Sequence, residues 1–182
     1  MKKSLSIWLT AVLTLFCAAC NEDKPVTKES TTKTEMIHVD LMNAKSEKIG
    51  MAMLSEVENG VKLNVEVSNL TPGKHGFHIH ENGNCTAPDF KSAGGHFNPD
   101  MKKHGSESSH GPHAGDLPNL EVSKEGKGKA EFIVKNVSLD PGQKNSLRKD
   151  GGTALVIHES ADDYRTDPSG NSGSRIACGV IK

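Results

Sequence analysis

The sequence has few aromatic residues, few cysteines and no basic cluster, and these shortages exclude several classes of protein. Its 182 residues include five Phe, one Tyr, one Trp and four Cys, and the formal net charge at pH 7 is −1. Without a basic run or an aromatic platform, the chain has no means to neutralise and stack on a polyphosphate, so no nucleic-acid partner is expected. The repeated long apolar runs of a polytopic membrane protein are also missing. Against these shortages, nine His stand out.

The N-terminus has the pattern of an export signal. Lys2 and Lys3 give it a positive start, and residues 4–16 form an apolar run too short to span a bilayer. Ala18 and Ala19 before Cys20 resemble a bacterial lipobox, although Cys17 stands where Leu is usual. We therefore expect residues 1–19 to be a lipoprotein signal peptide and Cys20 to carry the lipid. An uncleaved anchor helix and an ordinary cleaved signal are the alternatives.

The segment after the signal is polar and charged and has no apolar periodicity. Residues 20–34 are therefore predicted to be a disordered tether, and the functional domain is expected over residues 35–182. Acyl chains with a flexible leash hold a domain at a membrane surface without inserting it. The expected location is outside the cytoplasm, with the domain lipid-anchored to a bacterial cell membrane.

The domain is predicted to be all-β. Short stretches rich in Val, Ile, Leu and Met alternate with turn signals such as Asn59-Gly60 and Pro141-Gly142. No amphipathic stretch is long enough for a major helix. Eight strands are expected, at residues 36–42, 48–57, 61–67, 75–81, 117–122, 129–134, 153–158 and 175–181. This arrangement favours an antiparallel sandwich or barrel.

Two long intervals lack strand character, at residues 82–116 and 159–174. Long connections in a compact domain are usually functional or disordered. These two contain or directly follow most of the polar residues discussed below, so we expect them to be functional loops.

One predicted strand presents two imidazoles on the same face. In the segment around His78 and His80, alternation sends Phe77 and Ile79 to the opposite face, toward the core. Neutral imidazole is a good ligand for copper and zinc, and spacing by two along a strand sets the rings side by side. His158 is a third imidazole on a predicted strand.

The first long loop contains three further His and a carboxylate with zinc-ligand chemistry, namely His96, His104, His113 and Asp116. A metal held there would also explain how a loop with little hydrophobic content is ordered. A solvated His-rich loop is the alternative. His110 lies close enough to His113 to compete for its place in the set.

Five motifs in order closely resemble copper,zinc superoxide dismutase in its bacterial exported form. They are HGFHIHENGNC (75–85), GGHFNP (94–99), HAGDLPN (113–119), LVIHESADD (155–163) and GNSGSRIACGVI (170–181). The resemblance covers residues 36–181, nearly the whole predicted domain. It implies an eight-stranded antiparallel Greek-key barrel with the metals held outside it.

The resemblance also implies one copper and one zinc per subunit. The implied copper ligands are His78, His80, His96 and His158, and the implied zinc ligands are His96, His104, His113 and Asp116. His96 is then a bridging imidazolate that takes a proton when copper is reduced.

Further roles follow from the same motifs. Asp162 matches a carboxylate that orients one copper His and one zinc His, here His78 and His104. Arg175 matches the cation that attracts and orients superoxide. Cys85 and Cys178 match a disulfide pair, which persists in exported domains.

The implied activity is conversion of superoxide to oxygen and hydrogen peroxide. A surface-tethered copper- and zinc-binding lipoprotein without turnover is the main alternative. A family member that had lost its activity is expected to lack a metal ligand, and here every ligand position is filled. A zinc hydrolase needs an open zinc position, which a set with four protein ligands does not leave. The resemblance is compatible with a monomer or a homodimer.

Overall fold

The computed structural model describes residues 35–182, and nine strands and one short 3-10 helix make up its regular structure. The predicted signal peptide, Cys20 and the tether lie outside the described residues. Within residues 35–182, no helix has the length and apolar character needed to cross a membrane. The elements are β1 (Met36–Asn43), β2 (Lys48–Val57), β3 (Gly60–Val67), β4 (Gly73–His75), β5 (Phe77–His80), η1 (Lys91–Ala93), β6 (Leu120–Val122), β7 (Gly128–Val134), β8 (Thr153–His158) and β9 (Arg175–Ile181).

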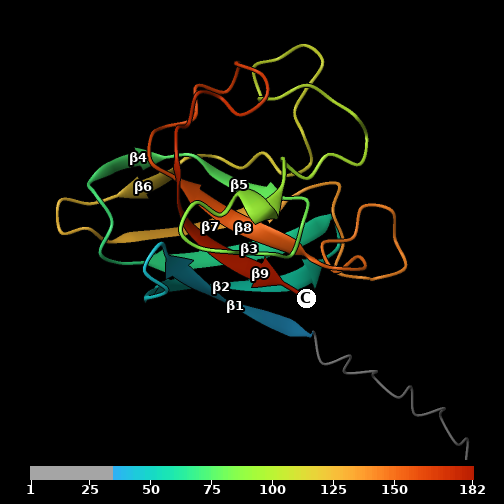
Figure 1. The fold of residues 1–182 in the computed structure, drawn as a ribbon. Coiled ribbons are helices and arrows are strands. Elements are labelled where there is room, and N and C mark those ends of the chain that lie inside the picture. Colours follow the sequence, from blue (N-terminus) through green and yellow to red (C-terminus); the bar gives the residue numbers. More distant parts are fainter. Residues whose placement is uncertain (1–34) are drawn as a thin grey trace, which may run out of the picture. The chain divides into compact units, whose positions relative to one another are not determined.

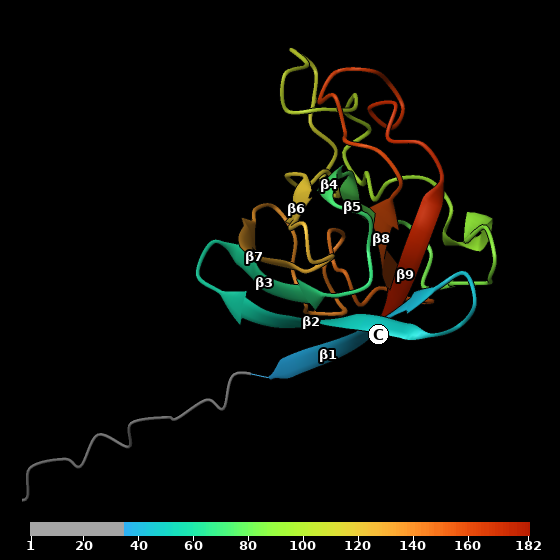
Figure 2. The same cartoon turned by 90° about the vertical axis from the view of Figure 1, so that its left-hand side faces the viewer.

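The strands form one antiparallel sheet that curls into a nearly closed barrel (Figures 1 and 2). Their order across the sheet is β4-β6-β7-β3-β2-β1-β9-β8-β5. The predicted all-β class is confirmed, and so is the predicted hairpin, in which Val57 of β2 pairs with Gly60 of β3. Buried Val, Ile and Leu side chains from most strands fill the barrel, with Phe77 and Phe97 among them.

The structure has nine strands where eight were expected, because the predicted strand at residues 75–81 is divided at Gly76. Before Gly76, β4 pairs with β6, and after it β5 pairs with β8. The backbone of Gly76 itself donates to Ser160 and accepts from His158, each at 2.8 Å. The chain therefore changes partners within one residue, which brings the two ends of the sheet together.

The two predicted loops connect β5 to β6 and β8 to β9, and they rise together on one side of the barrel (Figures 1 and 2). Lys103 of the first contacts Asp167 of the second at 2.7 Å. A third long connection, between β7 and β8, was not predicted to be special. Its Val137, Leu139 and Leu147 are buried in the core, so it closes one end of the barrel.

Candidate metal centre

Strand β5 presents the first two histidines of the site. Phe77 and Ile79 lie in the core, and the alternation of the strand sends His78 and His80 to the opposite face, as predicted. Both imidazoles are nevertheless buried, because the loop that follows β5 folds back over them.

Backbone pairing brings the loop to this strand. His78 forms an isolated bridge with Asp116, and His80 forms one with His96. Between them, Ile79 both donates and accepts a loop backbone hydrogen bond of 2.8 Å. Two loop residues with metal-ligand chemistry are thereby held beside the two strand histidines.

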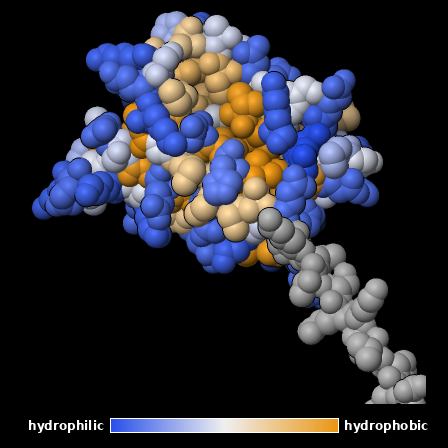
Figure 3. Space-filling model, turned by 90° about the horizontal axis from the view of Figure 1, so that it is seen from below, coloured by the Kyte–Doolittle hydropathy of each residue, from blue (hydrophilic) through white to orange (hydrophobic). Residues whose placement is uncertain are grey.

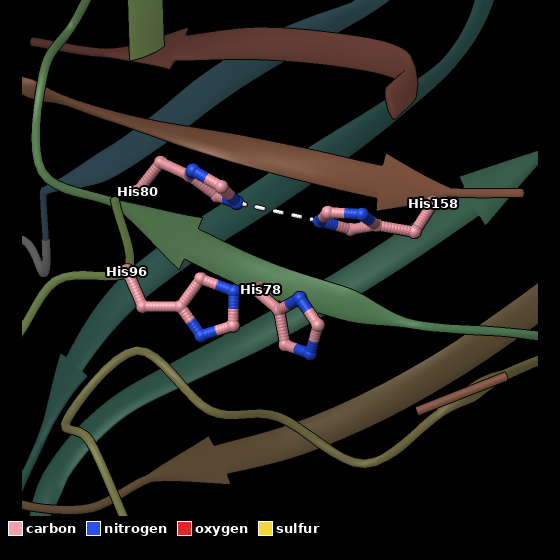
Figure 4. Close-up of side chains that lie close together, drawn as sticks. All are labelled: His78, His80, His96 and His158. Atoms are coloured by element: carbon pink, nitrogen blue, oxygen red, sulfur yellow. Dashed lines mark hydrogen bonds between the residues drawn. The ribbon is translucent and has the colours of Figure 1, made fainter. Parts of the chain in front are cut away.

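Four imidazoles converge at the first part of the centre, and Figure 4 shows how they face one another. One ligand atom from each ring lies within 4.8 Å of the others, in the set His78, His80, His96 and His158. The Nε2 atoms of His80 and His158 are 3.4 Å apart. These four are the residues for which the sequence implied copper.

Hydrogen bonds determine which nitrogen of each ring is free. The occupied atoms are His78 Nε2 against Asp162 at 2.8 Å, His80 Nδ1 against the Gly94 carbonyl at 2.9 Å, and His158 Nδ1 against the Gly173 carbonyl at 3.2 Å. Such partners fix the tautomer and the ring orientation of a ligand. The free atoms, His78 Nδ1 and Nε2 of His80 and His158, therefore turn toward the common centre.

Two atoms at this centre lack any hydrogen-bond partner among residues 35–182. They are the buried His78 Nδ1 and His96 Nε2. An unpaired buried polar atom costs about 1–3 kcal/mol, so native structures rarely keep one without a reason. Two such atoms in one ring of imidazoles fit a bound transition metal, and this donor set suits copper.

The second part of the centre is built around Asp116. Its Oδ1 lies 2.8 Å from His96 Nδ1, 3.1 Å from His104 Nδ1 and 3.3 Å from His113 Nδ1. Its Oδ2 accepts the backbone N–H groups of Gly105 and His113. Three imidazoles and one carboxylate match the closed tetrahedral set that zinc prefers.

His110 lies outside this second set. Its Nδ1 is 2.9 Å from the hydroxyl of Ser109, and its side chain is exposed. The structure thus brings His113, rather than its neighbour, to Asp116.

Two residues join the two parts. His96 belongs to both, with Nδ1 toward Asp116 and Nε2 toward the other imidazoles. Asp162 is 3% exposed and reaches both sides, since its Oδ2 accepts from His78 and its Oδ1 accepts from His104 at 3.0 Å. The predicted partners of Asp162 are the ones found.

Burial sets the protonation of two imidazoles in the first set. It lowers the pKa of His96 to about 4 and that of His158 to about 3. These rings are therefore neutral at neutral pH, with lone pairs available to a metal. Burial acts to raise the pKa of the Asp116 carboxyl, but hydrogen bonds from three His outweigh it and hold that pKa well below its usual range.

Arg175 stands beside the first set. At the start of β9, it donates to the carbonyls of Phe90 and Gly94, each at 2.7 Å. The Gly94 carbonyl also accepts from His80 Nδ1, so one oxygen holds the guanidinium and an imidazole. The side chain is only half-buried, which leaves its charge within reach of solvent.

The disulfide joins Cys85 to Cys178, with 5.6 Å between the Cα atoms. Cys178 lies three residues after Arg175 on β9, and Cys85 lies in the loop that also contains Phe90. The bond therefore ties the loop carbonyls that hold Arg175 to the strand that carries it.

Sequence reasoning did not assign Asn119, although it lies within one of the quoted motifs. Its side chain donates to the Asp162 carbonyl and accepts from the Asp162 N–H, at 2.9 and 2.8 Å. His75 faces the carbonyls of His158 and Thr71 through its two ring nitrogens. The carbonyls of Gly94 and Gly173 were also missed, because a backbone acceptor leaves no signal in a sequence.

Comparison with known proteins gives consistent matches. The family model described as copper/zinc superoxide dismutase matches residues 48–181. The chain is 54% identical over 146 residues to "Superoxide dismutase [Cu-Zn] 1" of Aquifex aeolicus, covering 80% of this chain and 86% of the relative. It is 42% identical to the "Superoxide dismutase-like protein YojM" of Bacillus subtilis, covering 97% of this chain and 94% of that one. A crystal structure of a SOD-like protein from Bacillus subtilis aligns with a TM-score of 0.77 at 45% identity, over 80% of this chain and 97% of that chain.

Proposed function

The chain belongs to the copper/zinc superoxide dismutase family and is a superoxide dismutase, and we propose how its own residues serve that reaction. Two superoxide anions and two protons become oxygen and hydrogen peroxide. When bound, copper supplies the alternate one-electron reduction and oxidation, while zinc supplies charge without redox chemistry. The residues of this chain hold these ions, control a proton and guide the anion.

The first set, His78, His80, His96 and His158, would hold copper through the ring nitrogens that face the common centre. The observation that carries this assignment is the pair of buried unpartnered nitrogens, one on His78 and one on His96. The second set would hold zinc, with Asp116 as its carboxylate ligand. His96 Nε2 would be the atom that takes up and releases a proton, because its Nδ1 is turned toward the zinc set at Asp116.

Asp162 acts as a positioning residue for both ions. Because it accepts from the Nε2 atoms of His78 and His104, the Nδ1 atoms of these two rings are left to bind metal. One carboxylate therefore sets the tautomers of a copper ligand and a zinc ligand together.

Metal analysis together with superoxide decay tests these assignments on the purified protein. We expect one copper and one zinc per chain, and activity that disappears when copper is removed and returns when it is restored. A protein that binds both ions at this ratio yet does not accelerate superoxide decay would instead be a metal carrier on the same scaffold.

Arg175 guides superoxide to the centre. Its guanidinium is fixed 2.7 Å from two carbonyls, and Cys85–Cys178 holds those carbonyls and β9 together. A fixed cation at a partly enclosed site raises the local concentration of an anion, and this enzyme class is itself an established example of such steering.

Arg175→Ala is expected to lower kcat/KM about tenfold or more and to flatten its dependence on ionic strength, because the charge that steers the anion is gone. The measurement is superoxide decay across a salt series. Arg165→Ala is the matched control, since this loop arginine is exposed and paired with Glu107. An unchanged salt profile in the Arg175 variant counts against steering by this residue.

We also propose that the protein is exported and held at the membrane by lipid on Cys20, as the lipobox-like Ala18-Ala19-Cys20 indicates. Cys20→Ser is then expected to move the protein from the membrane fraction to the soluble fraction, because the acylated thiol is lost. Fractionation of cells with immunodetection measures this. Cys17→Ser, which leaves the acceptor intact, should stay with the membrane. Retention of the Cys20 variant in membranes would refute lipid anchoring.

A further inference from the structure

The outer face of β1 and β2 carries a group of sulfur and imidazole side chains. On β1 the alternation puts Met36 and His38 outside, and on β2 it puts Met51 and Met53 outside. The residues between them face the core and are buried, namely Ile37, Val39, Ala52 and Leu54. Three of the six Met of the chain therefore lie on one small area of the barrel wall, beside an exposed His.

The strand register brings these side chains together. His38 pairs directly with Met53, which places their Cβ atoms about 5 Å apart. Met51 is the diagonal neighbour of His38, and Met36 is the diagonal neighbour of Met53, at about 7–8 Å. Methionine is unbranched with three rotatable bonds, so the sulfurs of Met51 and Met53 reach toward the His38 imidazole. Met36 lies four residues from Asp40, the residue opposite Met51, which is about 13 Å along the strand, so it does not join the same group of donors.

Packing does not account for this group. Exposed strand positions usually favour β-branched or aromatic residues rather than methionine. The neighbouring part of the same face is an ordinary solvated surface, on which Lys62 pairs with Glu131 and Lys129 pairs with Glu66. Figure 3, which looks at the side where β1 and β2 lie, shows hydrophobic surface exposed among hydrophilic residues. Met36 alone is 54% exposed.

We propose that His38, Met51 and Met53 form a surface site for a cuprous ion. Thioether sulfur is a soft ligand that selects Cu(I), and imidazole is a good partner ligand for copper. Two carboxylates lie opposite Met51, Asp40 on β1 and Glu66 on β3, but Asp40 is paired with Lys48 and Glu66 with Lys129, so the donors offered are uncharged. This site is separate from the catalytic centre, whose two metal sets contain only nitrogen and oxygen donors.

The test uses the full chain with copper and zinc already bound, kept under anaerobic conditions and titrated with Cu(I) against a chromogenic Cu(I) chelator. The wild type is expected to retain one Cu(I) per chain more than the His38→Gln/Met53→Leu variant. X-ray absorption of the added copper should show sulfur neighbours, which the catalytic centre does not provide. Dismutase activity should be equal in the two proteins, because neither residue belongs to the catalytic machinery.

The matched control is Met101→Leu/His110→Gln, which removes the same two residue types from an exposed loop where Met101 is 91% exposed. This control should keep the additional Cu(I). A wild type that retains no additional ion, or an equal loss in both double variants, overturns the proposal.

Methionine methyl NMR of the reduced wild type tests the site without any substitution. Added Cu(I) should shift the signals of Met51 and Met53 but not that of Met101, and unshifted signals also overturn the proposal.

Discussion

Replacing His80 with alanine is expected to eliminate most superoxide dismutase activity while the protein stays folded. His80 Nε2 faces His158 Nε2 at 3.4 Å, and its Nδ1 is fixed by the Gly94 carbonyl, so no other side chain replaces it. Loss of a residue that only orients a ligand lowers metal affinity or activity by about 10–100-fold. Loss of a ligand itself should exceed that range. Superoxide decay and copper content per chain measure the effect.

His110→Ala is the control for this experiment. Its imidazole is exposed and lies in neither metal set, so activity and metal content should match those of the wild type. If the His80 variant kept one copper, one zinc and full activity, the assignment of roles within the first set would be wrong. Zinc content in the His80 variant should change little, because the four residues of the second set, His96, His104, His113 and Asp116, remain.

The strand-borne part of the centre could be predicted because alternation is a local property. A chain that buries Phe77 and Ile79 has to send His78 and His80 to the other face. The loop-borne ligands could be proposed only from residue type and resemblance, since no periodicity applies to a loop. Their meeting depends on the pairing of His96 and Asp116 with β5, which is a tertiary contact.

Other features could not be predicted because they depend on how distant segments close. The division of one strand at Gly76 follows from hydrogen bonds to Ser160 and His158, more than 80 residues away. The choice of ring nitrogen depends on backbone carbonyls such as that of Gly94. The sulfur and imidazole group on the outer face was hidden for a similar reason, because only the register pairs His38 with Met53.

Asp116→Asn is expected to cause the largest loss of stability among single substitutions in the second set. One carboxylate oxygen lies within 3.3 Å of three imidazole nitrogens, and the other accepts two backbone N–H groups. Asparagine keeps the shape, but it removes the charge and turns one acceptor into a donor. Removing one partner of a buried ionic group costs about 3–5 kcal/mol. Loss of the zinc ligand adds to that cost, because a metal that binds only the folded state stabilises it.

Calorimetric Tm, zinc content and hydrogen exchange over residues 101–116 measure this effect together, and all three should change in the Asp116 variant. Asp100→Asn is the matched control, since this aspartate lies in the same loop but is exposed and paired with Lys144 at 3.2 Å. An exposed pair contributes about 0–1 kcal/mol, so its loss should barely move Tm. Because most of the loop lacks a hydrophobic core of its own, its order depends on the cluster at Asp116. An Asp116 variant with normal zinc and Tm would show that the loop is held by its contacts with β5 alone.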